Sequence, residues 1–271
     1  PGKNGKYVLI TGNQMGVLLA DYIIHSRKEL GKMPTNPGMI RSIVTSPMVD
    51  KICAKNGVQL DECLTGFKWI ANVMARYETS GSNQYIFGFE ESYGYNVETD
   101  VRDKDGVSAA AMCAEMTLYW RSVGKSLLER LEELYNEYGY FQDVAIAKNF
   151  PGSSGVDTMK NIMANLRKDG LKSLGGKKVV KIRDVGEQII YDPANPAAKE
   201  KLDLPSSNVL QFFLEGGTVV SARPSGTEPK IKFYVNATVP VDKGLDAAKA
   251  EAKELCAAIE KEINAILDAA N

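Results

Sequence analysis

Short apolar runs alternate with amphipathic stretches through the first half of the chain. The pattern predicts strands over residues 7–10, 41–45, 58–60 and 85–89, each bounded by polar or turn-forming residues. Between the first two strands, apolar residues recur at helical spacing at Met15, Leu18, Leu19, Tyr22 and Ile23. Strands that alternate with helices are typical of a mainly parallel sheet covered by helices. We therefore expect an α/β domain with a mixed, mainly parallel sheet and flanking helices over residues 1–140.

Local signals mark where several of these helices begin and end. Ser46-Pro47 is a favourable start for a helix, as N-cap and first helical residue. Thr65-Gly66 precedes a helix predicted over residues 67–77, and small residues predict another over 107–120. Ser126 and Glu129 have the spacing of a capping box, and the helix that they begin is expected to end at Gly139.

The second half has a different order of elements. Strands are expected over residues 141–149, 179–184, 188–191, 209–214, 218–223 and 230–235. One helix is predicted over residues 156–168, and the last helix carries an apolar stripe of Leu245, Ala248, Ala252, Leu255, Ile259, Ile263 and Ile266. Strands that cluster before a closing helix indicate an α+β domain with an antiparallel sheet, over residues 141–271.

Composition excludes several classes of protein. The formal net charge of the 271 residues is −1, so no overall positive field would recruit nucleic acid or an anionic membrane. Four scattered cysteines and one histidine, His25, argue against a zinc site and fit free thiols in a reducing compartment. No run of 18 apolar residues is present, and the first residues do not resemble a signal peptide. We expect a cytoplasmic protein.

The first candidate site is the stretch Phe87-Gly88-Phe89-Glu90-Glu91-Ser92-Tyr93-Gly94-Tyr95, where a strand runs into carboxylates and a hydroxyl. Ligands of open α/β sheets lie beyond the carboxyl ends of the strands. Carboxylates and hydroxyls at that edge suit a polyhydroxylated ligand, because a carboxylate accepts hydrogen bonds from neighbouring hydroxyls. The alternative is an acidic turn without a ligand.

The second candidate site is Arg223-Pro224-Ser225-Gly226-Thr227-Glu228-Pro229-Lys230, between two predicted strands. The guanidinium of Arg223 has the planar fork that suits a phosphate, and Ser225 and Thr227 add hydroxyl donors. Gly226 would permit a positive φ, so that backbone N–H groups converge on an anion. The alternative is an ordinary polar hairpin loop.

Both loops resemble those of the α-D-phosphohexomutases, the phosphoglucomutase and phosphomannomutase superfamily. The family's Gly-Glu-x-Ser loop is similar to residues 88–92, which implies that Glu90 and Ser92 hold sugar hydroxyls. Its Arg-x-Ser-x-Thr loop is matched from residue 223 onward. This match implies a binding site for the non-reacting phosphate, formed by Arg223, Ser225, Gly226, Thr227 and Lys230.

Two further segments gain a function only through this resemblance. Residues 102–106 resemble the family's Arg-x-Lys-Asp-Gly run, which implies that Arg102 and Lys104 contact the sugar substrate and that Lys104 takes part in proton transfer. The same stretch fails as a calcium loop, since Val101 and Met112 occupy positions that require carboxylates; a solvated charge run is the alternative. Residues 65–68 resemble a Thr-Gly-aromatic segment that helps distinguish two sugar orientations, through Thr65, Gly66 and Lys68.

The resemblance also implies what this stretch of sequence lacks. Phosphohexomutases have four domains, with a phosphorylated serine in the first and an Asp-x-Asp-x-Asp-Arg magnesium loop in the second, and neither motif is present here. We expect domains 3 and 4, a C-terminal half that is inactive alone, most similar to the bacterial phosphoglucomutases. The implied partners are sugar phosphates and the N-terminal domains, with Mg²⁺ bound by those domains and glucose 1,6-bisphosphate as intermediate.

Other functions remain open from the sequence. The whole enzyme would interconvert glucose 1-phosphate and glucose 6-phosphate, but a phosphomannomutase or phosphopentomutase of the same superfamily is an alternative. So is a binding module that recognises sugar phosphates without chemistry, or an interaction protein whose loops are incidental.

Overall fold

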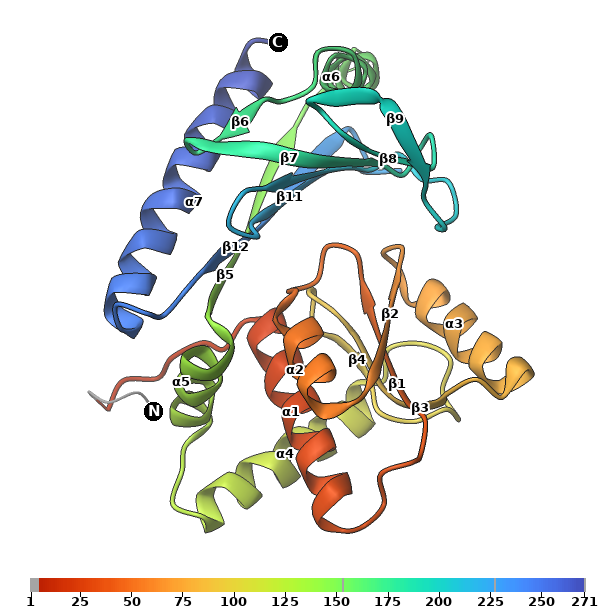
Figure 1. Ribbon diagram of the computed structural model, residues 1–271, viewed down its shortest axis with the longest axis vertical. Helices are drawn as coiled ribbons and strands as arrows, with labels where there is room; N and C mark the ends of the chain where they lie inside the picture. Colours follow the sequence, from red (N-terminus) through yellow and green to blue (C-terminus); the bar gives the residue numbers. More distant parts are fainter. Residues whose placement is uncertain (1–4, 153, 227, 271) are drawn as a thin grey trace. The chain divides into compact units, whose positions relative to one another are not determined.

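The computed structural model describes residues 5–152, 154–226 and 228–270. The chain divides into two compact units, one ending at Gly139 and the other beginning at Tyr140. In Figure 1 the first unit runs from red to green and the second from green to blue.

A four-stranded sheet forms the centre of the first unit. Its strands lie in the order β2-β1-β3-β4, with the following bounds: β1 (Pro37–Ser42), β2 (Gln59–Cys63), β3 (Gln84–Glu90) and β4 (Gly94–Asn96). The strand β1 pairs in parallel with β2 and β3, and β4 returns antiparallel to β3. The expected mixed, mainly parallel sheet is confirmed.

Helices cover both faces of this sheet. The five helices of the unit are α1 (Gly12–Glu29), α2 (Met48–Asn56), α3 (Phe67–Ser80), α4 (Gly106–Ser122) and α5 (Leu127–Tyr138). On one face α3 packs against Ile40 of β1. On the other face α1 crosses so closely that a Cβ at Gly16 would lie 2.1 Å from the ring of Phe89. Successive strand residues point to opposite faces, so this sheet is buried on both.

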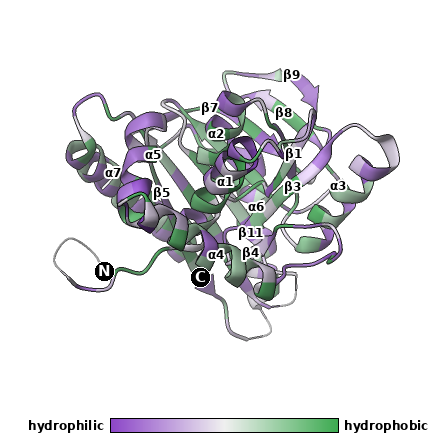
Figure 2. Cartoon of the chain, turned by 90° about the horizontal axis from the view of Figure 1, so that it is seen from below, coloured by the Kyte–Doolittle hydropathy of each residue, from purple (hydrophilic) through white to green (hydrophobic). Residues whose placement is uncertain are grey.

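Some expectations about this unit are wrong, and others hold. The strand expected over residues 41–45 lies earlier in the chain, as β1 ends at Ser42. Residues 7–10 do not form a strand, and the side chains of Tyr7 and Leu9 are 93% and 82% exposed. Figure 2 shows this hydrophobic segment in green outside the sheet. Ser46 is not an N-cap, because α2 begins after Pro47 without a side-chain cap. The capping box of Ser126 and Glu129 is confirmed, as is the end of α5 at Gly139.

The second unit is built on an antiparallel sheet in the order β5-β12-β11-β10-β7-β8-β9, with β6 beside β7. Its strands are β5 (Tyr140–Asn149), β6 (Ser173–Leu174), β7 (Lys177–Asp184), β8 (Ile189–Asp192), β9 (Asn195–Lys201), β10 (Leu210–Leu214), β11 (Val219–Pro224) and β12 (Lys230–Val239). The helices are α6 (Gly155–Asp169) and α7 (Leu245–Asp268). The predicted α+β organisation is confirmed. The sequence did not predict β9, whose residues are all exposed and show no apolar alternation.

One face of this sheet packs against both helices. Phe212 and Phe233 are fully buried there, beside Met163 of α6 and Ile259 and Ile263 of α7. The alternate strand positions therefore lie on the opposite face, which is more polar. In the described part of the chain, no helix has the length and apolar character needed to cross a lipid bilayer.

Candidate functional site

The first candidate site lies at the carboxyl end of the parallel strands of the first unit. Glu90 is the last residue of β3, and its side chain is almost completely buried. One of its carboxylate oxygens accepts a hydrogen bond from the backbone N–H of Gly66, the N-cap residue of α3. A carboxylate is favoured there because the N-terminus of a helix carries partial positive charge. The structure thus brings together two segments that the sequence singled out separately, Glu90 and the Thr65-Gly66 turn.

Ser92 lies in the exposed turn between β3 and β4. This turn touches the start of α1 so closely that a Cβ at Gly12 would lie 2.0 Å from the carbonyl oxygen of Glu91. The hydroxyl of Tyr95 donates to the carbonyl oxygen of Gly12 at 2.9 Å and holds the two segments together. Tyr93, at the corner of the turn, has a positive φ of 59°. The hydroxyl of Ser92 is therefore presented to solvent on a turn whose backbone is fixed by its neighbours.

Two buried polar residues at the same edge were missed. The side-chain oxygen of Asn13 accepts a hydrogen bond from the backbone N–H of Ser46 at 2.9 Å, and both residues are buried. Asn13 lies in the first turn of α1, and Ser46 follows β1. Ser46 directly follows the strand predicted over residues 41–45, a position that by itself predicts only the start of a helix. This contact ties α1 to the end of β1, at the same edge of the sheet as the turn that carries Ser92.

Near this edge lies an ion-pair cluster around a buried arginine. Arg41 of β1 binds Asp50 at 2.5 Å and Glu62 at 2.7 Å, and its side chain is 5% exposed. Burial disfavours the charged guanidinium, but the charges of Glu62 and Asp50 outweigh this effect and raise the pKa of Arg41. The cluster fixes β1 against α2 and β2, and the guanidinium of Arg41 donates to both carboxylates and to the carbonyl oxygen of Ser42.

Arg102 and Lys104, the predicted site residues in the loop after β4, are exposed. Asn96 is buried and donates to the carbonyl oxygens of Val101 at 2.8 Å and Asp103 at 3.0 Å, which shapes the loop. Lys104 projects from this loop with an exposed side chain. Arg102 forms an ion pair with Glu78 of α3 at 2.6 Å. The guanidinium of Arg102 is thus directed to the surface of α3.

The remaining predicted residue of the first site lies on α3. Lys68 is exposed, and its ammonium group lies 5.4 Å from the centre of the Trp69 ring. It follows the Gly66 turn by two residues, so it shares the helix N-terminus at which Glu90 is held. A cation there is not favoured by the helix dipole.

The second candidate site is the loop between β11 and β12. The backbone N–H of Ser225 donates to the carbonyl oxygen of Lys230 at 2.7 Å, which closes the loop. The Ser225 hydroxyl accepts a hydrogen bond from the N–H of Glu228 at 3.3 Å. Arg223 is half-buried at the end of β11, whereas Gly226 is exposed at the tip. Thr227 lies outside the described residues.

The expected positive φ of Gly226 is not found. Its φ lies outside the left-handed region, and a Cβ on it would meet nothing within 4 Å. The loop is instead closed by the hydrogen bonds of Ser225. A left-handed glycine is therefore not the device that shapes this loop.

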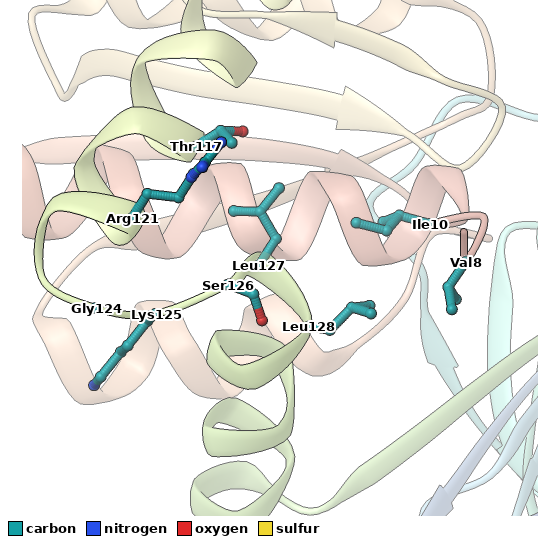
Figure 3. A pocket seen from close by; sticks show the side chains of 9 residues that line it. All are labelled: Val8, Ile10, Thr117, Arg121, Gly124, Lys125, Ser126, Leu127 and Leu128. Carbon is teal, nitrogen blue, oxygen red and sulfur yellow. The ribbon is translucent and has the colours of Figure 1, made fainter. Parts of the chain in front are cut away.

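The first unit also has a groove of about 700 Å³ that contains none of the predicted site residues. Figure 3 shows it between Val8 and Ile10 and the corner that joins α4 to α5. The segment Gly124-Lys125-Ser126, whose sequence resembles the end of a P-loop, lies at this corner. Its Ser126 is the N-cap of α5. Over residues 5–152, 154–226 and 228–270, no three His, Cys, Asp or Glu side chains are grouped so as to hold a metal ion.

Residues 11–138 match the model described as phosphoglucomutase/phosphomannomutase, alpha/beta/alpha domain III, and residues 153–254 match that of the C-terminal domain of the same family. The chain belongs to the phosphoglucomutase/phosphomannomutase family. The resemblance that the loops indicated is confirmed, and the chain corresponds to the C-terminal half of its relatives.

Individual members of the phosphoglucomutase/phosphomannomutase family agree with this assignment. A phosphoglucomutase of Staphylococcus saprophyticus is 33% identical over 84% of this chain and 40% of its own length. A phosphopentomutase of Mus musculus is 35% identical over 95% of this chain and 42% of its own length. The solved open form of a Paramecium phosphoglucomutase covers 97% of the chain with a TM-score of 0.60 and 18% identity, which supports the fold. The chain spans less than half of the length of these relatives.

Proposed function

We propose that the chain is the substrate-binding half of a phosphoglucomutase, which interconverts glucose 1-phosphate and glucose 6-phosphate. The observation that carries this proposal is the pair of loops in a confirmed family member. One presents Glu90 and Ser92 at the carboxyl edge of a sheet, and the other presents Arg223 between two strands. Curated relatives named phosphoglucomutase support the choice of substrate.

In this proposal each loop binds one end of the substrate. Arg223 donates paired hydrogen bonds to the non-reacting phosphate, and the Ser225 hydroxyl adds a further donor. Glu90 and Ser92 bind sugar hydroxyls, while Thr65, Gly66 and Lys68 line the same strand edge. The Glu90 carboxylate already holds Gly66 by one oxygen, so a sugar hydroxyl would share an acceptor whose position is fixed beforehand.

The transfer step itself depends on groups that this stretch of sequence does not encode. We propose that a phosphoserine donates the phosphoryl group through a glucose 1,6-bisphosphate intermediate, and that Mg²⁺ held by other domains neutralises charge on the transferring group. Lys104 is the candidate for proton transfer, since its exposed ammonium group lies on a loop that Asn96 holds in place. From the composition we also propose a cytoplasmic location.

A phosphopentomutase is the strongest alternative. The mouse phosphopentomutase is as similar to this chain as the bacterial phosphoglucomutases are, and its similarity extends over more of the chain. A phosphomannomutase is supported only by the name of the family. A non-catalytic sugar-phosphate binding module would use the same two loops.

The test has two stages. The chain alone should bind glucose 6-phosphate at a millimolar Kd, as an order-of-magnitude expectation for a few exposed polar contacts. It should show no turnover in a coupled assay with magnesium and glucose 1,6-bisphosphate. Fusing the N-terminal domains of a relative should restore conversion of glucose 1-phosphate, and comparison with ribose 1-phosphate would separate the two mutase activities. Sustained turnover by the chain alone would contradict the proposal.

A further inference from the structure

The second unit contains a cavity of about 720 Å³ that includes none of the predicted site residues. It lies against the last turns of α6, over residues 164–170, and against β7, β8 and β9 toward the β9 edge of the sheet. The residues that line it all belong to this unit. Cavities of this size hold ligands as large as a drug molecule. The proposed function of the two loops makes no use of this cavity.

The floor of the cavity is an apolar strip of the sheet that α6 leaves partly uncovered. Tyr191 of β8 pairs with Ile182 of β7, which pairs in turn with Phe212 of β10. Paired residues of neighbouring strands point to the same face, so Tyr191 points toward the core, and so does Ile189 two positions before it. Ile182 and Phe212 are buried, whereas Ile189 and Tyr191 stay partly exposed. The core face of the sheet therefore continues beyond the cover of α6.

Two lysines lie beside this floor. Lys199 of β9 is directly opposite Tyr191 in the antiparallel register, so both point to one face with Cβ atoms about 5 Å apart. Lys168 lies in the last turn of α6, on another side of the cavity. Both lysines are exposed, and within the described residues neither forms an ion pair. The cavity thus offers positive charge that no described carboxylate neutralises.

The acidic residues of the cavity are placed differently. Asp184 is buried, and its two oxygens accept hydrogen bonds from Arg167 at 2.8 and 3.3 Å, so this pair carries no net charge. Glu187 lies before the start of β8, and Asp169 is the last residue of α6. Both are exposed, and neither is paired with Tyr191 in the sheet. The charge that the register places directly beside Tyr191 is therefore positive.

Tyr191 adds a hydrogen-bond donor, and prolines add a rigid wall. Burial and the charge of Asp184 raise the pKa of Tyr191, so its hydroxyl keeps its proton and can donate to an anion. Pro193, directly after β8, and Pro196 of β9 line the cavity. The ring of proline fixes φ, so this wall loses little freedom when a ligand enters.

We propose that this cavity binds a small organic anion with a flat apolar ring, such as an aromatic carboxylate. The ring would lie over Ile189 and Tyr191, where its burial removes apolar surface from water. The carboxylate would accept hydrogen bonds from Lys199 and from the Tyr191 hydroxyl, while Lys168 adds positive charge. The site is separate from the two candidate loops, so this inference does not depend on their proposed function.

The experiment is an NMR titration of the chain with three ligands that share one ring system and differ in charge. They are the anion naphthoate, the neutral amide naphthamide and the cation naphthylmethylammonium. At about pH 7 the lysines are charged and naphthoate is ionised. The backbone amide signals of Ile189 and Tyr191 should shift. Naphthoate should bind about fivefold more tightly than naphthamide, and the cation should bind most weakly.

Substitutions then separate the role of charge from that of the ring. Lys199→Gln should weaken naphthoate binding about threefold and leave naphthamide binding unchanged, because the apolar floor remains. Tyr191→Phe keeps a ring and loses the donor, so it should also weaken naphthoate alone. The matched control Lys253→Gln, on the exposed side of α7, should change neither. Arg121→Gln, in the groove of the first unit, should change neither as well.

Filling the cavity provides the last measurement. Ala164 is exposed on α6 and lines the cavity, so Ala164→Trp should abolish the binding of both naphthoate and naphthamide. Its thermal unfolding midpoint should stay close to that of the unmodified chain, because no buried side chain is changed. Equal affinity for naphthoate and naphthamide, or binding that survives Ala164→Trp, would overturn the inference. Loss of binding in Arg121→Gln but not in Lys199→Gln would place the ligand in the first unit and overturn it too.

Discussion

Arg41 and Arg223 are the same type of residue at comparable places, since each lies within two residues of the end of a strand, yet their surroundings are opposite. Arg41 is buried and held by Asp50 and Glu62. Arg223 is half-buried and faces Lys232 with no ion pair among the described residues. A cation that the protein has neutralised stabilises the fold, whereas one left without a counter-charge is available for an anionic ligand. Loss of the first should therefore reduce stability, and loss of the second should reduce binding.

The largest expected effect is on stability at Arg41. Arg41→Met leaves the partly exposed carboxylates of Asp50 and Glu62 without their shared cation, so the free energy of unfolding of the first unit should fall by about 2–3 kcal/mol. Both tryptophans, Trp69 and Trp120, lie in the first unit, so urea unfolding followed by tryptophan fluorescence reports on that unit alone. Arg27→Met, at the end of α1, is the control. Equal stability of the two variants would remove the distinction between the two arginines.

The next effect is on binding at Arg223. Arg223→Ala should weaken binding of glucose 6-phosphate by about 1.5–3 kcal/mol, because charge-assisted hydrogen bonds to phosphate are lost. Arg223→Lys should restore only part of the affinity, since it lacks the planar fork. Circular dichroism should show a thermal midpoint close to that of the unmodified chain. Unchanged affinity in a titration would exclude the loop from the site.

Glu90 combines the two behaviours, because its carboxylate is both a structural acceptor and a candidate ligand for sugar. Glu90→Gln keeps an oxygen for the Gly66 N–H but loses the charge at the N-terminus of α3, so stability should fall by about 1 kcal/mol. In an enzyme with its N-terminal domains restored, kcat/KM should fall while competition by inorganic phosphate stays the same. Glu98→Gln, an exposed residue of the next loop, should have neither effect.

The smallest expected effect is a loss of stability at alkaline pH, caused by buried cysteine thiols in both units. Burial raises the pKa of Cys53 and of Cys63 to about 12, and that of Cys256 in the second unit to about 11. Above a pH of about 8.5 the unfolded thiols ionise while the folded ones keep their protons, so stability is lost as pH rises. Each thiol contributes about 1.4 kcal/mol per pH unit in that range.

Tryptophan-monitored unfolding of the first unit should therefore weaken between pH 8.5 and pH 10. The double variant Cys53→Ala, Cys63→Ala should show a shallower dependence on pH than the unmodified chain. A slope that is the same in both proteins would mean that other groups cause the alkaline loss.

Much of the candidate site could be predicted from sequence, because its signals are local. An apolar run followed by Glu90 and Ser92 identified the end of β3, and two strands around residues 223–230 identified a loop. Ser126 and Glu129 predicted their own capping box, since the interaction involves residues three apart. The roles assigned to Lys104, Arg102 and Lys68 came from the resemblance to the family and stay predictions.

The tertiary structure decided everything that depends on a distant partner. Residues 7–10 have the composition of a strand, but a strand needs another strand to pair with, and none of the described strands pairs with them. Glu90 meets Gly66, and Arg41 meets Glu62, only because β1, β2 and β3 are parallel neighbours in one register. In the same way the register of β11 with β12 sets Lys232 opposite Arg223. Sequence patterns indicate which residues are buried, whereas strand register determines which charged side chains lie next to one another. The sequence pattern does not reveal the register, because the register is fixed by hydrogen bonds between segments far apart in the chain.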